Sequence, residues 1–365
     1  MKKAICILLS LCVLLPLIGC HVQPTEDPTV PSTEAAPGAS TAAEATLPEA
    51  DPWYAKINFD HYRCYDWTGP VVEMPEAFYY ISEDGLYRYD KQSGQDDLLI
   101  QEDIRGLSRY EGKVYYFTPQ QICCLTDDSG TSTVIWEESM YPYKPSSYLG
   151  LFDFQLNDGS LYIKISGIDA IRYILETGET RYFLSSKPDS LYYPDVPPND
   201  YSSLALRGEY CYYIDHSQRT FSIYRMNIDT EQAELVRGDG ITACVDIYNK
   251  WFYDDVVCYH GEIYYTIRRT GDIYRYQEEG NDEMILDLSA LEVGLEFIQC
   301  PYYPNLCFFT IANGQEHVYE YDEEGNFNLL VSFDKEIFDW QRILVTESAV
   351  FWRESESGIV HCDMK

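Results

Sequence analysis

Large apolar and aromatic residues recur in pairs along the chain, and a second apolar position follows each pair 8 to 12 residues later. The two positions keep this register seven times, although the spacing between successive pairs varies from 36 to 52 residues. The first positions are Phe78, Val114, Leu161, Cys211, Ile263, Cys307 and Val350, and the second are Leu86, Ile122, Ile171, Ile223, Ile273, Val318 and Ile359. A pattern that keeps its internal register in this way predicts a structural repeat.

Each repeat has the pattern of several short strands. Turn residues such as those at 83–85 and 270–272 separate the two apolar positions, which is typical of a hairpin. A further strand-like run precedes each hairpin, for example residues 150–156, and another follows most of them, for example residues 133–136. Four strands in about 45 residues make one propeller blade. We therefore predict an all-β fold, a seven-bladed β-propeller of four-stranded antiparallel blades, with a count of six or eight blades left open.

The two ends of the repeat array predict how the ring closes. The seventh copy has only six residues after Ile359, too few for an outermost strand, whereas residues 53–74 are long enough to hold an additional strand before the first blade. An N-terminal strand that completes the last blade would account for both observations. It would also remove an exposed sheet edge, which is an aggregation hazard.

Two shorter segments precede the propeller domain, which we assign to residues 51–365. Residues 21–50 contain five prolines among Thr, Glu, Ala and Ser, and no aromatic residue. Such a composition cannot bury enough apolar surface to offset the entropy lost on ordering. We expect residues 20–50 to be a disordered linker with a reach of roughly 30 Å, and residues 1–19 to be a signal peptide.

The signal peptide decides the expected location. Lysines at positions 2 and 3 precede an apolar run of 16 residues that contains Pro16, whereas a membrane-spanning helix needs about 20 apolar residues. The run ends in Leu17-Ile18-Gly19-Cys20, which resembles the lipobox of bacterial lipoproteins. The resemblance implies cleavage before Cys20, attachment of lipid to that cysteine, and anchoring on the extracytoplasmic side of a bacterial cell membrane.

The hairpins carry a second resemblance. Residues 264–266 followed by 273–275, and residues 212–215 followed by 223–225, are similar to the propeller repeats of low-density-lipoprotein-receptor-type domains. The tryptophan and aspartate of that family are mostly replaced here, and the tryptophan-aspartate repeat signature is missing. The resemblance implies the fold and leaves the partner open, because propellers host many functions.

Charge and cysteine content limit the partners. The formal net charge of −34 repels nucleic acid and anionic lipid headgroups, so we expect no nucleic-acid partner, membrane attachment through the lipid, and a monomer. Nine cysteines follow Cys20, and an odd number argues against a complete disulfide framework, although pairing of individual cysteines stays open. Cys211 and Cys307 occupy an apolar column, where we interpret them as small core residues.

Candidate metal ligands are few. The six histidines are isolated from one another, and adjacent Cys123 and Cys124 point to opposite faces of a strand. The acidic runs at 127–130 and 322–326 fall where a blade needs a tight turn, and turn chemistry accounts for them, although calcium binding there stays open. We expect no metal site and no cofactor.

The candidate ligand-binding residues lie in three long links between blades, at 140–148, 185–201 and 238–251. These links carry Tyr141, Tyr143, Tyr192, Tyr193, Tyr248 and Trp251. Aromatic rings in loops on a rigid scaffold could stack on sugar rings or anchor a protein partner. The alternative is that these residues only seal the loops, since the chain contains 34 tyrosines.

No catalytic residue is assigned, because 60 carboxylates make any chosen pair uninformative and no nucleophile or phosphate-binding motif is present. We interpret the chain as a non-catalytic binding or interaction module at the bacterial cell surface. Two alternatives stay open. One is a glycan-active hydrolase or lyase with acidic residues in the propeller cavity, and the other is an accessory subunit of an envelope complex.

Overall fold

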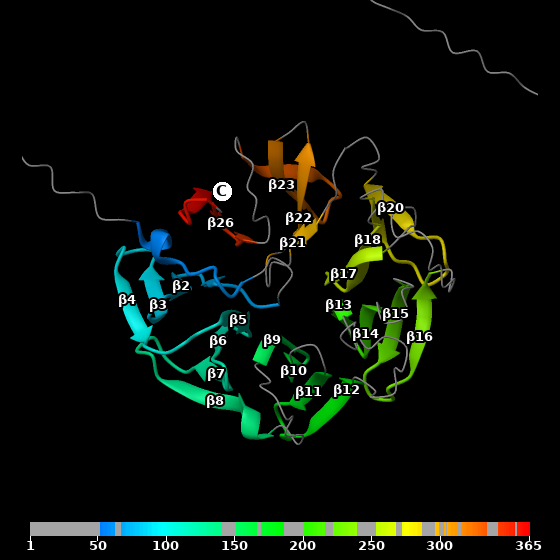
Figure 1. The fold of residues 1–365 in the computed structure, drawn as a ribbon, viewed down its shortest axis with the longest axis horizontal. Coiled ribbons are helices and arrows are strands. Elements are labelled where there is room, and N and C mark those ends of the chain that lie inside the picture. The colour runs from blue at the N-terminus through cyan, green and yellow to red at the C-terminus, as the bar shows by residue number, and fades with distance from the viewer. Residues whose placement is uncertain are drawn as a thin grey trace, which may run out of the picture. The chain divides into compact units, whose positions relative to one another are not determined.

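The strands form seven antiparallel sheets that follow one another around a ring (Figure 1). The computed structural model describes residues 52–62, 67–140, 151–165, 169–185, 201–215, 222–238, 253–267, 272–286, 296–298, 303, 305–312, 315–333, 342–354 and 356–365. In these residues no helix is long and apolar enough to cross a membrane, and the helical elements are two short 3-10 turns, η1 (Trp53–Lys56) and η2 (Glu138–Met140).

The blades follow the chain in order, each with its earliest strand innermost. Blade 1 contains β1 (Val71–Glu73), β2 (Ala77–Ser82), β3 (Gly85–Asp90) and β4 (Asp96–Ile100), and blade 2 contains β5 (Gly106–Tyr110), β6 (Lys113–Phe117), β7 (Gln121–Leu125) and β8 (Ser132–Glu137). Blade 3 contains β9 (Leu151–Asn157), β10 (Ser160–Ile165), β11 (Asp169–Ile174) and β12 (Thr180–Ser185), and blade 4 contains β13 (Tyr201–Arg207), β14 (Tyr210–Asp215), β15 (Ser222–Asn227) and β16 (Ala233–Arg237). Blade 5 contains β17 (Tyr253–Tyr259), β18 (Glu262–Ile267), β19 (Ile273–Arg275) and β20 (Glu283–Leu286), and blade 6 contains β21 (Glu296–Ile298), β22 (Leu306–Ala312), β23 (Gln315–Tyr321) and β24 (Phe327–Phe333). Blade 7 contains β25 (Ile343–Val345), β26 (Ala349–Arg353) and β27 (Val360–Met364).

The structure confirms the seven-bladed propeller and the two apolar columns. All seven first positions lie in the second strand of a blade and are buried, and six of the second positions are buried in the third strand. The exception is Ile359, which is 55% exposed, whereas Val360 is 5% exposed and pairs with Arg353 in the equivalent register. The column in the last blade therefore runs through Val360, one residue later than predicted, because the turn before β27 reaches one residue further.

The hairpins between first and second strands use tight turns with left-handed backbone. Asp158 and Gly159 have φ angles of 49° and 65°, and His260 and Gly261 have φ angles of 47° and 72°. Two consecutive residues with positive φ are the signature of a type I′ turn, whose twist matches that of the flanking strands. Gly159 and Gly261, each two residues before a first apolar position, thus help to set the register of the first two strands.

The predicted closing strand is not present in the described residues of the segment from 53 to 74. Residues 53–56 form η1, residues 57–62 belong to no strand, and β1 is the innermost strand of blade 1. The prediction that this segment completes the last blade is wrong. Apolar side chains of its described residues pack between the first and last blades instead, where they are removed from water.

Packing around Trp53 is the first part of this closure. The Trp53 ring stacks on Phe78 and Tyr89 of blade 1, with centroid distances of 5.0 and 4.7 Å, and meets Phe351 of blade 7 at 5.7 Å. η1 also contacts β27. One aromatic side chain from the N-terminal segment therefore touches both ends of the ring.

Residues 57–62 continue the closure. Ile57, Phe59 and Tyr62 are buried in one cluster with the inner strands of blades 1, 6 and 7. The Tyr62 hydroxyl donates a hydrogen bond of 2.8 Å to the carbonyl oxygen of Ile343, and the Arg342 guanidinium donates to the carbonyl oxygens of Phe59 and Tyr62. Blade 7 is thus bonded to the N-terminal segment through its first strand.

A buried carboxylate links blades 1 and 7 directly. Glu73 of β1 accepts hydrogen bonds from Lys91 Nζ at 2.6 Å and from the backbone N and Oγ of Ser348 at 2.9 and 2.6 Å. Burial by itself raises the pKa of this carboxyl, but the donors on Lys91 and Ser348 override it and hold the pKa below its ordinary value. The carboxylate therefore stays ionised at neutral pH and joins the two ends of the ring.

Candidate functional site

The residues predicted to bind ligand lie outside the described residues. Tyr141 and Tyr143 belong to the link between β8 and β9, Tyr192 and Tyr193 to the link between β12 and β13, and Tyr248 and Trp251 to the link between β16 and β17. Cys20 also lies outside. The assignment of these residues to a ligand site and to lipidation therefore stays a prediction.

The strand order does place the three links within the chain. Each one joins the outermost strand of a blade to the innermost strand of the next, as the sequence indicated. In the six four-stranded blades the register also shifts by one residue between the third and fourth strands, at the second apolar position or next to it. The β-bulge is thus part of the repeat in each of these blades. The additional residues of the longer repeats lie in links and turns.

A segment that precedes β1 crosses the inner ends of three blades. Gly69 exchanges backbone hydrogen bonds with Leu107 of β5, at 2.9 and 2.8 Å, and Trp67 Nε1 donates to the carbonyl oxygen of Leu204 in β13 at 3.2 Å. Figure 1 shows this part of the chain, in blue, running from the rim toward the middle of the ring. Residues 67–69 thus connect blades 2 and 4 from the inside.

Asp153 of β9 anchors the same segment to blade 3. One carboxylate oxygen accepts from the backbone N of Trp67 at 2.6 Å, and the other accepts from the backbone N and Oγ of Thr68 at 3.0 and 2.8 Å. The backbone N of Phe154 adds a further bond of 2.9 Å. Because Asp153 is 1% exposed, these donors replace the water that a carboxylate otherwise needs.

A lysine completes this buried group. Lys164 Nζ lies 3.3 Å from the Asp153 carboxylate and 4.0 Å from the centre of the Trp67 ring, so it forms an ion pair and a cation–π contact at once. Burial raises the pKa of the Asp153 carboxyl, and the Lys164 ammonium and the Trp67 and Thr68 donors oppose that shift. Both carboxylate oxygens are already engaged. The arrangement suits a structural anchor more than an acid or base that exchanges protons with a substrate.

Four of the six described cysteines are buried, and Cys258 and Cys362 are partly buried. Cys211 and Cys307 are buried, as predicted for the first column, and burial raises the pKa of Cys211 to about 12. Burial likewise raises the pKa of Cys258 and of Cys362 to about 11. A thiol with so high a pKa is protonated at neutral pH and is a poor nucleophile.

Metal ligation finds no support among the described residues. They include no group of three or more His, Cys, Asp or Glu side chains placed to hold an ion. Cys123 and Cys124 are buried in two different clusters, which confirms that they point to opposite faces of β7.

The two acidic turns are built by hydrogen bonds within the turn. Asp127 Oδ1 accepts from the backbone N of Ser129 and Thr131, at 2.9 and 3.1 Å, and hydrogen bonds from these two residues lower the pKa of Asp127 to about 2. Asp322 accepts from the backbone N of Asn326 at 2.8 Å in the same way. The interpretation as turn chemistry is confirmed.

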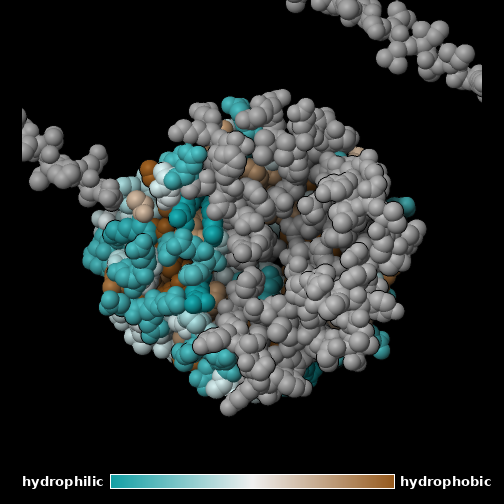
Figure 2. Space-filling view, viewed as in Figure 1, coloured by the Kyte–Doolittle hydropathy of each residue, from teal (hydrophilic) through white to brown (hydrophobic). Residues whose placement is uncertain are grey.

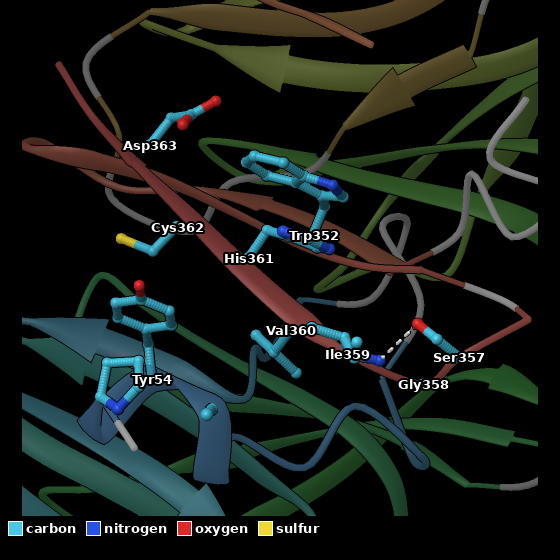
Figure 3. A pocket seen from close by; sticks show the side chains of 11 residues that line it. Tyr54, Trp352, Ser357, Gly358, Ile359, Val360, His361, Cys362 and Asp363 are labelled. Carbon is cyan, nitrogen blue, oxygen red and sulfur yellow. Dashed lines mark hydrogen bonds between the residues drawn. The ribbon is translucent and has the colours of Figure 1, made fainter. Parts of the chain in front are cut away.

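An open groove lies along β27. Its volume is about 740 Å³, and it is lined by Pro52 and Tyr54 on one side and by Trp352 and residues 357–363 on the other (Figure 3). The His361 ring stacks on Trp352 with a centroid distance of 5.0 Å. By contrast, the described surface over β2–β4 is mostly hydrophilic on the face drawn in Figure 2. The groove combines aromatic, imidazole and backbone polar groups.

Sequence reasoning missed both the Asp153 anchor and the β27 groove. A signal for the first was present, since Asp153 stands between Phe152 and Phe154 in a strand-like run, where an isolated charge needs a partner if the strand is buried. The partner could not be named, because Trp67 and Thr68 are far away in the sequence.

Comparison with known proteins supports the propeller fold and identifies neither a family nor a function. No family model and no curated protein matches the chain. A chain in the crystal structure of the mitotic checkpoint complex is 9% identical, with a TM-score of 0.51 over 90% of this chain and 99% of that one. PorZ, a surface component of the type-IX secretion system of Porphyromonas gingivalis, is 10% identical with a TM-score of 0.47, over 83% of this chain and 39% of its own. A structure of YCF48 bound to D1 peptide is 12% identical with a TM-score of 0.48, over 82% and 93% of the two chains.

Proposed function

We propose that the chain is a lipid-anchored, extracytoplasmic propeller that acts as a non-catalytic binding or interaction module at the bacterial cell surface. The proposal rests on the contrast between buried polar groups that stabilise the scaffold and links whose length varies from blade to blade. The buried carboxylates Glu73 and Asp153 and the buried thiols serve the scaffold, whereas the chain length varies in the links between strands. Loops on such a rigid scaffold are where binding residues usually lie.

The same observation favours binding over hydrolysis. A glycan-active enzyme would need a pair of carboxyl groups free to protonate the substrate and to attack it or activate water. Asp153, the buried acid on the innermost strand of blade 3, has both oxygens occupied by donors of the chain itself. A role as accessory subunit of an envelope complex is a special case of the proposed binding, in which the partner is a protein.

The lipid anchor is tested by replacing the acceptor cysteine. We expect Cys20→Ala to abolish incorporation of a metabolic fatty-acid label and to release the protein from the membrane fraction or leave it as unprocessed precursor, because no other residue of the lipobox can take the lipid. The measurement is labelling and fractionation of mutant and parent side by side. Equal labelling of the two would end the proposal of lipidation.

The ligand face is tested by removing aromatic rings from the links. We expect Tyr192→Ala, Tyr193→Ala and Trp251→Ala together to weaken binding to insoluble cell-wall glycan about thirtyfold or more, because loss of one hot-spot ring typically costs about 2 kcal/mol. The melting temperature should stay that of the parent. The measurement is co-sedimentation with purified cell-wall glycan, and the same assay with an immobilised candidate envelope protein covers a protein ligand.

A variant in an acidic turn is the control for that experiment. Glu324→Ala changes an exposed residue between β23 and β24, in a turn that the structure describes fully. It should bind like the parent. Unchanged binding by the triple variant together with loss in the control would move the ligand site away from the long links.

A further inference from the structure

Among the described residues, the outer edge of the last blade has no partner strand. The other six blades each have a fourth strand, but within the described part of the chain nothing pairs with the outer side of β27. Lys365 N donates to Ser348 O at 2.8 Å, and Glu354 N donates to Ile359 O at 2.9 Å. These bonds fix which residues of β27 face β26, since hydrogen-bonded pairs alternate along an antiparallel ladder. The N–H and C=O groups of Val360, Cys362 and Met364 therefore point outward.

Two hollows lie along the outer edge of β27. The groove of about 740 Å³ is lined by His361 and Asp363 from one face of β27 and by Val360 and Cys362 from the other, so it runs along the edge itself (Figure 3). A second hollow of about 600 Å³, lined on the blade 1 side by Tyr89 and Asp96, reaches Cys362 and Met364. Pro52 and Tyr54 also line both hollows, so the open space lies between β27 and the N-terminal segment.

Apolar exposure is also concentrated here. Among the described large apolar side chains, Met364 at 66% and Ile359 at 55% are more exposed than any other, and both lie at the ends of β27. An unpaired edge strand flanked by exposed apolar side chains can pair with a strand of another chain.

We propose that β27 pairs antiparallel with β27 of a second copy of this chain, about a twofold axis at Cys362, so that two blades form one continuous sheet. In this register Val360 lies opposite the partner's Met364, and His361 lies opposite the partner's Asp363. An imidazole N–H donating to a carboxylate then occurs twice, once on each side of the axis. Such an interface is self-complementary, as twofold symmetry requires.

The charges select this register among the neighbouring ones. A twofold axis at His361 would place two imidazoles opposite each other. An axis at Asp363 would oppose two carboxylates and would bring His361 next to Lys365 of the partner subunit. Like charges directly opposite each other destabilise a strand pair. Of the three axes, only the one at Cys362 places each His361 opposite an Asp363 and each Val360 opposite a Met364.

The proposal is tested by measuring the mass of the full-length chain, kept in solution with a mild detergent, across a concentration series. Cys362→Pro removes an N–H that faces outward and leaves the bonds to β26 in place, and proline is tolerated on sheet edges. We expect the parent to dimerise and Cys362→Pro to stay monomeric with a melting temperature close to that of the parent. Sedimentation equilibrium provides the dissociation constants.

A charge exchange tests the register itself. Asp363→Lys should weaken the dimer about tenfold or more, because it places lysine opposite the partner's His361. The double variant His361→Asp with Asp363→Lys should restore dimerisation, since unlike charges again face each other. Glu279→Lys, the same change of charge in an exposed turn of blade 5, is the matched control and should behave like the parent.

Three results would overturn the proposal. The first is a parent that stays monomeric at every concentration. The second is a dimer that Cys362→Pro leaves as tight as before. The third is a monomer that dimerises only after residues 24–45 are deleted, which would assign the edge of β27 to the N-terminal segment of the same chain.

Discussion

Replacing Asp153 with alanine is expected to lower the free energy of unfolding by about 3–5 kcal/mol, because it leaves the Lys164 ammonium and four hydrogen-bond donors without an acceptor. The corresponding fall in melting temperature is roughly 10 °C for a domain of this size. The measurement is thermal and denaturant unfolding of parent and variant, monitored by circular dichroism. Asp153→Ala should also free residues 67–69 from the inner strands, which hydrogen exchange at Trp67 and Thr68 would report.

An exposed ion pair provides the control for this prediction. Asp103 lies 3.2 Å from Arg105, and its side chain is 56% exposed. Asp103→Ala removes the same kind of charge and is expected to cost less than about 1 kcal/mol, since water solvates the remaining arginine. Equal effects of the two variants would show that Asp153 does not anchor the segment.

Deleting residues 53–65 is expected to lower the free energy of unfolding by about 5 kcal/mol or more. The deletion exposes the cluster that Ile57, Phe59 and Tyr62 share with blades 1 and 7, and each large buried side chain contributes about 1.5–3 kcal/mol. Phe59→Ala, a single change at a side chain with no exposed surface, should cost about 3–5 kcal/mol. The measurement is denaturant unfolding of the three proteins under the same conditions.

A deletion within the linker of residues 20–50 is the control for the deletion of residues 53–65. Removing residues 24–45 should leave the unfolding transition nearly unchanged, because a proline-rich segment without aromatic residues contributes little packing. If both deletions shifted the transition by similar amounts, the N-terminal segment would not be the part of the chain that closes the ring.

The blade pattern could be predicted from the sequence because it is local. Residues that form one hairpin lie within a dozen positions of each other, and the apolar columns and the glycines at 159 and 261 mark the strands and turns directly. One column residue was misplaced, Ile359 instead of Val360, because the apolar pattern does not fix the register at a turn. Two adjacent apolar residues at a turn fit the pattern equally well, and only the register with Arg353 decides between them.

The closure of the ring could not be predicted in detail. The sequence showed that the last copy lacks a strand and that residues 53–74 are available, and a fourth strand was the simplest interpretation. The choice between strand pairing and side-chain packing depends on surfaces from blades 1, 6 and 7 at once. No sequence pattern holds that information. The assignment of a ligand site to the residues from Tyr141 to Trp251 stays a prediction, because they lie outside the described residues.

The sequence by itself determined the unit of this protein: seven hairpin-based repeats, whose apolar columns need a neighbour on each side, and an N-terminus that resembles a lipoprotein signal. Only the tertiary structure decided how the units are held together, through Asp153 across the inner strands and through Trp53 and Glu73 between the first and last blades. It also shows that no described strand pairs with the outer side of β27. The physical reason is the separation in sequence of the residues that interact. Hydrogen-bond ladders and hairpin turns are set by residues close in sequence, whereas a buried charge or an aromatic contact is favourable only once distant segments exclude water together.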